Sequence, residues 1–350
     1  MPIRLGLIGA GNIVRTRHLP NLRRLGDRVH CVAVANRRRE TAAEVAREAA
    51  IPHVYDSWET LVAEAPIDAV LIGAPPYLHR DASIAALERG LHVFCQARMA
   101  MDFAQAQEMA AAARRASRRG LISMLCYPPL FLSGDAVVRE LLTDGSIGRV
   151  RHVVAAIGSA AYVDPGRPLH WRQQWRISGL NTLELGMVAE VLHRWLGPFA
   201  AVAASAATFT PHRPLPDDPG RLAPVERPDA VSIAARTASG ALCTLFFSGV
   251  DRAAKRYIEI HGERGSLRYE ADPDALFYTA DERWRPVPLT GREFTWRAEA
   301  DFIAAIERGT PPPYPNPTFE DGLRYMEFTE AVFRSAEEGR EVRLPLRDPP

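Results

Sequence analysis

The sequence predicts an α/β protein of two domains, in which a nucleotide-binding half precedes a strand-rich half. Three observations support this prediction. An apolar run at residues 3–9 leads into a glycine turn, strands and helices then alternate as far as about residue 124, and strand patterns cluster beyond that point. The 350 residues are enough for two full hydrophobic cores. We therefore expect domains at 1–124 and 125–350.

The first strand enters Gly9-Ala10-Gly11-Asn12-Ile13-Val14, and a helical pattern follows through Leu25. Gly9 permits a tight turn, and Gly11 lets the backbone approach a pyrophosphate at the helix N-terminus, formed here by Asn12 and Ile13. Val14 occupies the third glycine position of the usual fingerprint and should push helix and strand slightly apart. The context predicts a dinucleotide site, and an ordinary strand-to-helix turn is the alternative.

Composition narrows the class of protein. A formal net charge of +1 with 47% hydrophobic residues gives no electrostatic signature of nucleic-acid binding. No apolar run approaches the ~18 residues that a membrane span needs, and the N-terminus leads directly into the first strand. We therefore expect a cytoplasmic protein with a small-molecule substrate. Its four cysteines lack metal-ligand spacing, so we expect buried thiols and no metal.

The second strand, residues 29–35, ends at Asn36-Arg37-Arg38-Arg39, where the adenosine ribose of a dinucleotide normally lies. An acidic residue here favours NAD. Asn36 removes that carboxylate, and Arg37 and Arg38 are suited to a ribose 2′-phosphate. We therefore expect NADP first, with NAD as a possibility. A plain surface turn capped by arginines is the alternative.

A third strand, residues 69–74, stops at Pro75-Pro76 and is followed by His79. A helix and a fourth strand then lead through Gly90-Leu91-His92-Val93-Phe94-Cys95 to Gln96-Ala97-Arg98. In these features the chain resembles the glucose-fructose oxidoreductase / inositol dehydrogenase / rhizopine catabolism (Gfo/Idh/MocA) family. The resemblance continues in order through Asp144–Val150, Trp171-Arg172, Ser178-Gly179 and Phe319–Gly339.

The resemblance implies an N-terminal Rossmann NAD(P)-binding domain and a C-terminal α+β domain with a large, mostly antiparallel open sheet for substrate binding and oligomerisation. It also implies a homodimer or homotetramer formed through that sheet. Strand patterns at 149–158, 199–210, 229–238, 241–249, 256–261 and 274–280 agree, as do helical patterns at 132–143, 180–196, 296–308 and 318–338. Pro211–Pro228 reads as a long loop, either an active-site cover or disordered.

The family places Glu-Lys-Pro where this chain has Gln96-Ala97-Arg98. Gln96 can still bond a nicotinamide ribose hydroxyl, but Ala97, facing the substrate, can neither donate nor accept a proton. Arg98 can bind a carboxylate or phosphate of the ligand, or a cofactor phosphate. The lysine has not moved nearby, because Lys255 is the only lysine in the chain.

The second family signature aligns with residues 178–191, where the usual histidine becomes Val188 and the last aspartate Val191. On one helix, Asn181, Glu184, Val188 and Val191 share a face, so we expect them at the substrate pocket. Leu130 stands where the family has a polar residue. Together these changes predict a substrate with an apolar part.

Replacement acid–base groups must come from what remains. Glu184 is the first candidate, because a carboxylate on a mostly apolar helix is suited to act as a base. A salt bridge from Glu184 to Arg172 or Arg176 is the equal alternative. Tyr127 and His170 are weaker candidates. By resemblance, Trp171 and Arg172 touch the nicotinamide end.

Pro75 and His79 are expected to order the cofactor loop, with a packing role for His79 as the alternative. These features predict an NAD(P)-dependent oxidoreductase acting on a carbonyl or carbinol of a sugar-like or glycoside substrate. The alternative is a cofactor-binding protein without redox turnover, such as a ligand-sensing regulator or a redox-neutral enzyme.

Overall fold

The computed structural model describes residues 1–346 and divides the chain into two compact units. Unit 1 contains Met1–Tyr127 and Arg297–Leu323, and unit 2 contains Pro128–Trp296 and the chain from Arg324 on. Sequence analysis assigned residues 297–323 to the second domain. They join unit 1 because α9 (Ala298–Arg308) buries Phe302 against Phe94 of a unit 1 strand, with ring centroids 5.4 Å apart.

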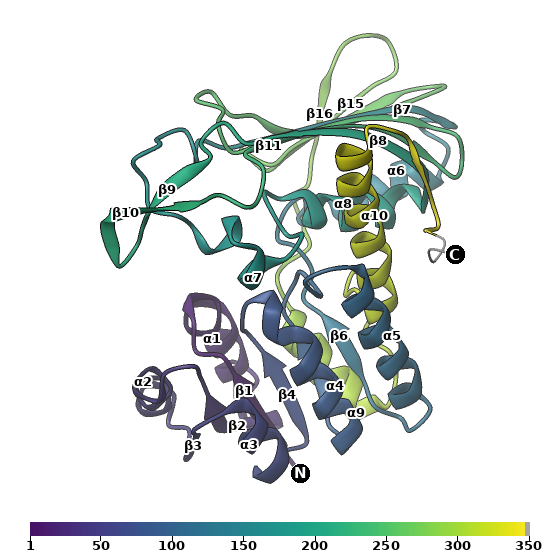
Figure 1. The fold of residues 1–350 in the computed structure, drawn as a ribbon. Helices are drawn as coiled ribbons and strands as arrows, with labels where there is room; N and C mark the ends of the chain where they lie inside the picture. The colour runs from purple at the N-terminus through teal and green to yellow at the C-terminus, as the bar shows by residue number, and fades with distance from the viewer. Residues whose placement is uncertain (347–350) are drawn as a thin grey trace. The chain divides into compact units, whose positions relative to one another are not determined.

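Unit 1 is built on a six-stranded sheet in which every neighbouring pair is parallel. Its order β3-β2-β1-β4-β5-β6 is that of a Rossmann fold, with the change of winding direction between β1 and β4. The strands, purple to blue in Figure 1, are β1 (Ile3–Ile8), β2 (Val29–Ala35), β3 (His53–Tyr55), β4 (Ala69–Ile72), β5 (His92–Cys95) and β6 (Ser123–Leu125).

Helices connect these strands. The principal ones are α2 (Arg39–Ala49), α3 (Trp58–Glu64), α4 (His79–Arg89) and α5 (Phe103–Ser117). The helix after the glycine turn begins with a π-helical stretch, Val14–His18, and continues as α1 (Leu19–Arg23). Short 3₁₀ turns lie at Gly26–Arg28 and Pro76–Leu78.

Val14 is fully buried, and its neighbour across the sheet explains how it fits. A Cβ added at Gly73, directly after β4, would lie 2.3 Å from the Val14 Cγ2. The side chain at the third fingerprint position therefore occupies space that a glycine on the adjacent strand provides. The sequence predicted that Val14 would push the helix and strand apart. The absence of a side chain at Gly73 provides the space that Val14 needs.

Unit 2 is built on a nine-stranded sheet of order β16-β15-β14-β13-β7-β12-β11-β8-β17. Only β7 and β12 pair in parallel, so the sheet is mostly antiparallel, as expected. Its strands are β7 (Val150–Gly158), β8 (Phe199–Ala207), β11 (Ala230–Thr237), β12 (Leu242–Ser248), β13 (Arg256–Gly262), β14 (Ser266–Glu270), β15 (Ala275–Thr279), β16 (Arg285–Val287) and β17 (Val342–Arg343).

One face of this sheet is covered by α6 (Asp135–Thr143), α8 (Leu185–Leu196) and the later part of α10 (Phe319–Glu338), as Figure 1 shows. Side chains of β12 alternate accordingly. Cys243, Leu245 and Phe247 are buried, whereas Leu242 and Phe246 on the other face remain 51% and 39% exposed. The period of two therefore leaves an apolar strip on the open face.

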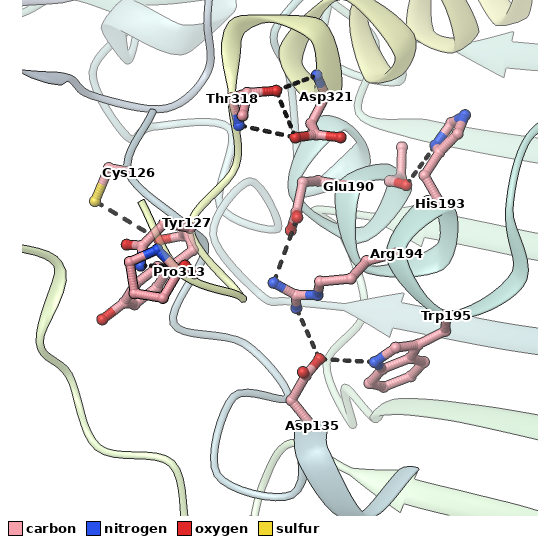
Figure 2. A network of polar contacts seen from close by, with 12 residues as sticks. Cys126, Tyr127, Asp135, Glu190, His193, Arg194, Trp195, Pro313, Thr318 and Asp321 are labelled. Atoms are coloured by element: carbon pink, nitrogen blue, oxygen red, sulfur yellow. Dashed lines mark hydrogen bonds and ion pairs between the residues drawn. The ribbon is translucent and has the colours of Figure 1, made fainter. Parts of the chain in front are cut away.

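A buried ionic network anchors α8 to α6 (Figure 2). Arg194 lies 3.0 Å from the Asp135 carboxylate and 3.3 Å from that of Glu190, and the indole Nε1–H of Trp195 donates to Asp135 at 2.7 Å. Charges this deeply buried are tolerated when each has an opposite partner and further hydrogen bonds. The network fixes the helix whose N-cap residue, Glu184, lines the cavity described below.

Two sequence-based expectations for unit 2 are wrong. Pro211–Pro228 is not an open loop or a disordered segment, because β9 (His212–Leu215) and β10 (Asp218–Pro224) form an antiparallel hairpin there. The helix expected at 180–196 begins only at Leu185. Residues before it form a turn in which Leu183 adopts φ +51°, a left-handed conformation that ends any continuous helix. A short helix, α7 (Trp175–Ser178), precedes this turn.

Within residues 1–346, no helix is both long and apolar enough to cross a bilayer. In the same range, no three histidine, cysteine or acidic side chains gather in a way that could hold a metal ion.

The contact between Gly73 and Val14 yields a stability prediction. Gly73→Ala should destabilise unit 1 by about 1–3 kcal/mol, because the new methyl group overlaps a side chain with no free space. Val14→Ala alone should lower the free energy of unfolding by less than Gly73→Ala does. In the double variant, Val14→Ala should restore most of the stability that Gly73→Ala removes. The measurement is the free energy of unfolding from denaturant titration of all three variants. Additive losses would contradict the proposed contact.

Candidate functional site

The ends of β1 and β4 approach each other closely at the glycine turn. Gly9 has φ +99°, and a Cβ there would lie 2.8 Å from the Gly73 carbonyl group. Gly11 is exposed, and a Cβ there would meet nothing within 4 Å. The turn is therefore open on its outer side, where Asn12 and Ile13 begin the helix. Such an open glycine turn at a helix N-terminus fits a dinucleotide pyrophosphate.

The end of β2 carries the residues expected to select the cofactor. The Asn36 side-chain oxygen accepts a hydrogen bond from the Ala10 amide at 3.3 Å, which ties β2 to the glycine turn. Arg39 forms an ion pair with Asp56. Arg37 and Arg38 are exposed, and within residues 1–346 neither guanidinium group forms a hydrogen bond or ion pair. These two guanidinium groups are available to a ligand.

Gln96, at the end of β5, is backed by a buried pair of residues. His18 and Glu299 are 0% and 1% exposed, and the His18 Nδ1–H donates to Glu299 Oε1 at 2.6 Å. With that proton placed, the His18 Nε2 accepts from the Gln96 side-chain amide. Gln96 therefore directs its carbonyl oxygen away from His18. This oxygen is an acceptor suited to a ribose hydroxyl.

His79 joins the turns that follow β4 and β5. It is fully buried, with Nε2 2.7 Å from the Ala74 carbonyl oxygen and Nδ1 2.9 Å from that of Arg98. Burial lowers the pKa of His79, although the two carbonyl groups oppose this effect. His79 therefore orders both turns from within. Pro75 begins the intervening 3₁₀ turn, and Arg98 is 97% buried while Ala97 is half-exposed.

Tyr127 is placed as a structural residue. It is 1% exposed, and its hydroxyl oxygen accepts the Arg297 backbone N–H at 2.7 Å. Burial raises the pKa of this phenol well above its ordinary value. A phenol held in this way is poorly suited to the acid–base role considered from the sequence.

Unit 2 contains a cavity of about 610 Å³ at the ends of β7 and β12 and the start of β13. It brings together three residues singled out from the sequence, namely His170, Arg172 and Glu184. Their positions in the sequence did not predict that these three side chains would line the same cavity. The other lining residues are Ile157, Gly158, Ser159, Ala161, Tyr162, Arg167, Pro168, Leu183, Arg213, Ser248 and Arg256.

Glu184 is held by Arg256 rather than by the expected Arg172 or Arg176. The Arg256 Nη2 and Nε donate to the Glu184 carboxylate at 2.6 and 3.1 Å, and Nη1 donates to Asp272 at 3.0 Å. The pair also borders a second cavity of about 230 Å³, whose apolar wall includes Leu130 and Met187. Glu184 thus stands between two cavities with its oxygens engaged, a geometry that favours an anchor over a base.

His170 caps the 3₁₀ turn Trp171–Gln173. Its Nδ1 accepts the Arg172 backbone N–H at 3.3 Å, so the neutral ring carries its proton on Nε2. Burial and the Arg172 charge both lower the pKa of His170, which keeps the ring neutral near pH 7. Within residues 1–346, Nε2 has no partner. His170 therefore offers the cavity a free N–H donor.

The other residues predicted for the substrate pocket do not line this cavity. Val188 and Val191 are fully buried in α8, so their face serves the core and not the cavity. Asn181 is 1% exposed, and its amide donates to the Ser178 carbonyl at 2.7 Å, closing the turn before α8. The prediction of a shared helical face fails here because the helix, expected from residue 180, starts five residues later at Leu185.

Sequence analysis missed Arg213, Arg256, Arg167 and Tyr162 as cavity residues. Arg213 lies on β9, in the segment interpreted as a loop. The signal that was present is Pro216-Asp217-Asp218-Pro219-Gly220, a composition typical of a tight turn between two strands. Recognising that turn would have predicted the hairpin, although not the direction of Arg213.

Comparisons with known proteins agree with this architecture. Residues 3–123 match the family model described as oxidoreductase family, NAD-binding Rossmann fold, and residues 136–268 match the GFO/IDH/MocA C-terminal domain. Levoglucosan dehydrogenase from Pseudarthrobacter phenanthrenivorans is 26% identical over 89% of each chain. The 1,5-anhydro-D-fructose reductase of Ensifer adhaerens is 26% identical over 97% of this chain and 98% of its own.

Solved structures give the same result. An oxidoreductase domain protein from Kribbella flavida superposes with a TM-score of 0.87 at 26% identity, covering 99% of this chain and all of its own. A levoglucosan dehydrogenase in complex with NADH and L-sorbose superposes with a TM-score of 0.86 at 25% identity, covering 98% and 99%.

The support behind Gln96 yields a second stability prediction. Glu299→Leu should lower the free energy of unfolding by about 1–3 kcal/mol, because it leaves the buried His18 Nδ1–H without an acceptor. Glu307→Leu on the same helix is the matched control, since Glu307 is exposed and pairs with Arg28 at the surface. That variant should change stability by less than about 1 kcal/mol. Equal losses in denaturant titrations would contradict the assignment.

Proposed function

The chain belongs to the Gfo/Idh/MocA oxidoreductase family and is an NAD(P)-dependent oxidoreductase, and from that premise we propose where its substrate binds and which residues act on it. The substrate is a sugar-like carbonyl or carbinol compound held in the cavity of unit 2. The observation that carries this proposal is the convergence of His170, Arg172 and Glu184 on one cavity. The bound cofactor supplies or accepts hydride.

Unit 1 provides the cofactor site in this proposal. Gly9 and Gly11 admit the pyrophosphate, and the Gln96 carbonyl oxygen accepts a hydrogen bond from the nicotinamide ribose. Arg37 and Arg38 grip a 2′-phosphate, which makes NADP the preferred form. The two free guanidinium groups and the uncharged Asn36 support this preference.

His170 takes over the task of the missing lysine and histidine. We propose that its Nε2–H donates to the substrate oxygen and stabilises the alkoxide that forms there as hydride arrives, and that this alkoxide then takes its proton from water. A neutral imidazole can act in this way when its other nitrogen is engaged. Glu184 keeps Arg256 in place beside the cavity. The free Nε2 and the lowered pKa of His170 support this assignment over Glu184.

The cofactor-binding protein without redox turnover remains the second candidate function. The observation in its favour is the absence of any lysine beside Gln96, because Lys255 is the only lysine and it lies exposed before β13. The cavity nonetheless contains a neutral histidine, His170, with a free N–H donor, and this observation favours the oxidoreductase over the non-redox protein.

We also propose that a second copy covers the open face of the nine-stranded sheet. The exposed Leu242 and Phe246 lie on one face of β12 and support this interface, because apolar side chains that gather on one exposed face mark a surface for association. Light scattering should therefore give the mass of a dimer or tetramer, and a monomer mass would contradict the interface.

Cofactor preference is tested at the end of β2. Replacing Arg37 and Arg38 together by alanine should weaken NADPH binding at least about tenfold and leave NADH binding nearly unchanged, because only the former carries the phosphate. Arg47→Ala, an exposed arginine on α2, is the control and should change neither. Fluorescence titration at fixed ionic strength measures both affinities. Equal weakening for the two cofactors would contradict the assignment.

Turnover tests the role of His170. With NADPH and a panel of keto-sugars, His170→Ala should lower kcat by about 10²- to 10⁴-fold. His170→Gln should retain more activity because its amide also donates. Wild-type turnover should persist as pH falls through about 6.5, the ordinary pKa of histidine, and decline only below it. His152→Ala, outside the cavity, is the control.

The pH profile follows from the sign of the pKa shift. The pKa of His170 is lowered, so the neutral ring persists to more acidic pH than an exposed histidine would allow. An unaltered kcat in His170→Ala would contradict the role of His170. If no sugar is turned over while NADPH binds tightly, with sugar acids and sugar phosphates included in the panel, the result favours the second candidate function.

A further inference from the structure

The cavity of unit 2 contains more positive charge than its own side chains neutralise. Four of its lining residues are arginines, and Glu184 is the only carboxylate among them. We infer that the substrate carries an anionic oxygen group, a carboxylate or a phosphate, and that Arg172 binds it with help from Arg167. This inference rests on the proposed function and names the substrate class of the same site.

The carboxylate of Glu184 is already paired with Arg256. Arg256 donates to it at 2.6 and 3.1 Å and also donates to Asp272 at 3.0 Å, so the Glu184 oxygens are already hydrogen-bonded. The remaining arginines have no carboxylate in contact within residues 1–346. Arg167 donates to the Ala161 carbonyl oxygen at 3.0 Å, which leaves its charge unbalanced.

Arg172 is the clearest case. Its guanidinium carbon lies 4.4 Å from the centre of the Trp171 ring, which holds the plane in place without occupying the edge donors. Within residues 1–346, the guanidinium group has no hydrogen-bond acceptor and no ion pair. Burial lowers the pKa of Arg172 although the charges of Tyr162 and Glu184 oppose this effect, a sign that water solvates the guanidinium group poorly. A desolvated guanidinium group with free N–H donors is stabilised by an oxyanion.

Arg213, a further lining residue, adds to the positive potential of the cavity. It is fully buried, and its terminal nitrogens donate to the carbonyl oxygens of Tyr162 and Asp164 at 2.6 and 2.7 Å. Its Nε–H has no acceptor among the described residues. Carbonyl groups fix the position of the guanidinium group but do not cancel its charge. The field at the cavity therefore favours an anion.

The other ligand classes fit this lining less well. An apolar aglycone would remove the remaining water from Arg172 and Arg167 and return no hydrogen bonds. A neutral polyol would satisfy single donors but would leave both charges unbalanced. The hydroxyl groups of Ser159 and Ser248 also line the cavity and are suited to sugar hydroxyls. A sugar acid or a sugar phosphate uses both kinds of group, which replaces the apolar substrate expected from Leu130.

The test uses the full chain saturated with NADP⁺ and isothermal titration with three probes: D-glucose, D-glucuronate and D-glucose 6-phosphate. At least one charged probe should bind about tenfold or more tightly than glucose, since a charge-assisted bidentate contact contributes that much. Tighter glucuronate binding indicates a carboxylate, and tighter glucose 6-phosphate binding indicates a phosphate. Equal binding of all three would overturn the inference.

Variants then locate the contact. Arg172→Met should weaken the preferred charged probe about 10- to 100-fold and leave glucose nearly unchanged. Arg176→Met is the matched control, because Arg176 is exposed on α7 and does not line the cavity. Arg167→Met should weaken the same probe by a smaller factor, and this variant at an exposed residue keeps the test decisive if Arg172→Met does not fold.

Two results distinguish failure of this inference from failure of the proposed function. If Arg172→Met weakens NADP⁺ binding and leaves the probe preference unchanged, the guanidinium group serves the cofactor and the inference is overturned. If neutral sugars are turned over with no preference for charge, the oxidoreductase stands and the inference fails. Selective binding of a charged probe that depends on Arg172, without any turnover, supports the anion site and rejects the proposed redox role.

Discussion

The fold of unit 1 depends on one close approach, that of the backbone after β1 to the backbone after β4. Gly9, with φ +99°, lies so near Gly73 that a Cβ would come within 2.8 Å of its carbonyl group. Gly73 in turn has no room for a side chain, because Val14 fills the space. Two missing side chains thus set the position of the glycine turn and of the helix that follows. As a result, the backbone beside Gly11 is left open, and this space can admit the pyrophosphate of a dinucleotide.

Unit 2 follows a different constraint, the pairing of buried charge. Where arginine meets carboxylate, the structure is fixed: Arg194 with Asp135 and Glu190 anchors α8, and Arg256 with Glu184 closes one wall of the cavity. Where arginine lacks a carboxylate, as at Arg172, we propose that a ligand supplies the negative charge. This contrast within one unit is the reason for proposing His170, the weaker candidate from the sequence, over the first candidate Glu184, whose oxygens are bonded to Arg256.

The sequence was informative where local patterns decide the outcome. The glycine turn and the alternating apolar strands predicted the Rossmann half, and periodicity located most strands of the second sheet. It was less informative where long-range packing decides. Residues 297–323 join unit 1 through Phe302. The hairpin that carries Arg213 lies in a proline-rich segment that was interpreted as a loop. The ion-pair partner of Glu184 is Arg256, 72 positions along the chain. Such contacts have no local signature, so the cavity could not be assembled from motifs alone.

The central claim is that this chain keeps hydride transfer although the lysine beside Gln96 has been replaced by Ala97. Transfer of label from deuterated NADPH to a sugar acid or sugar phosphate tests it most directly, followed by mass spectrometry of the product. We expect deuterium on the new carbinol carbon with wild-type protein and little with His170→Ala, at unchanged cofactor affinity. Tight cofactor binding with no label in any product would contradict it.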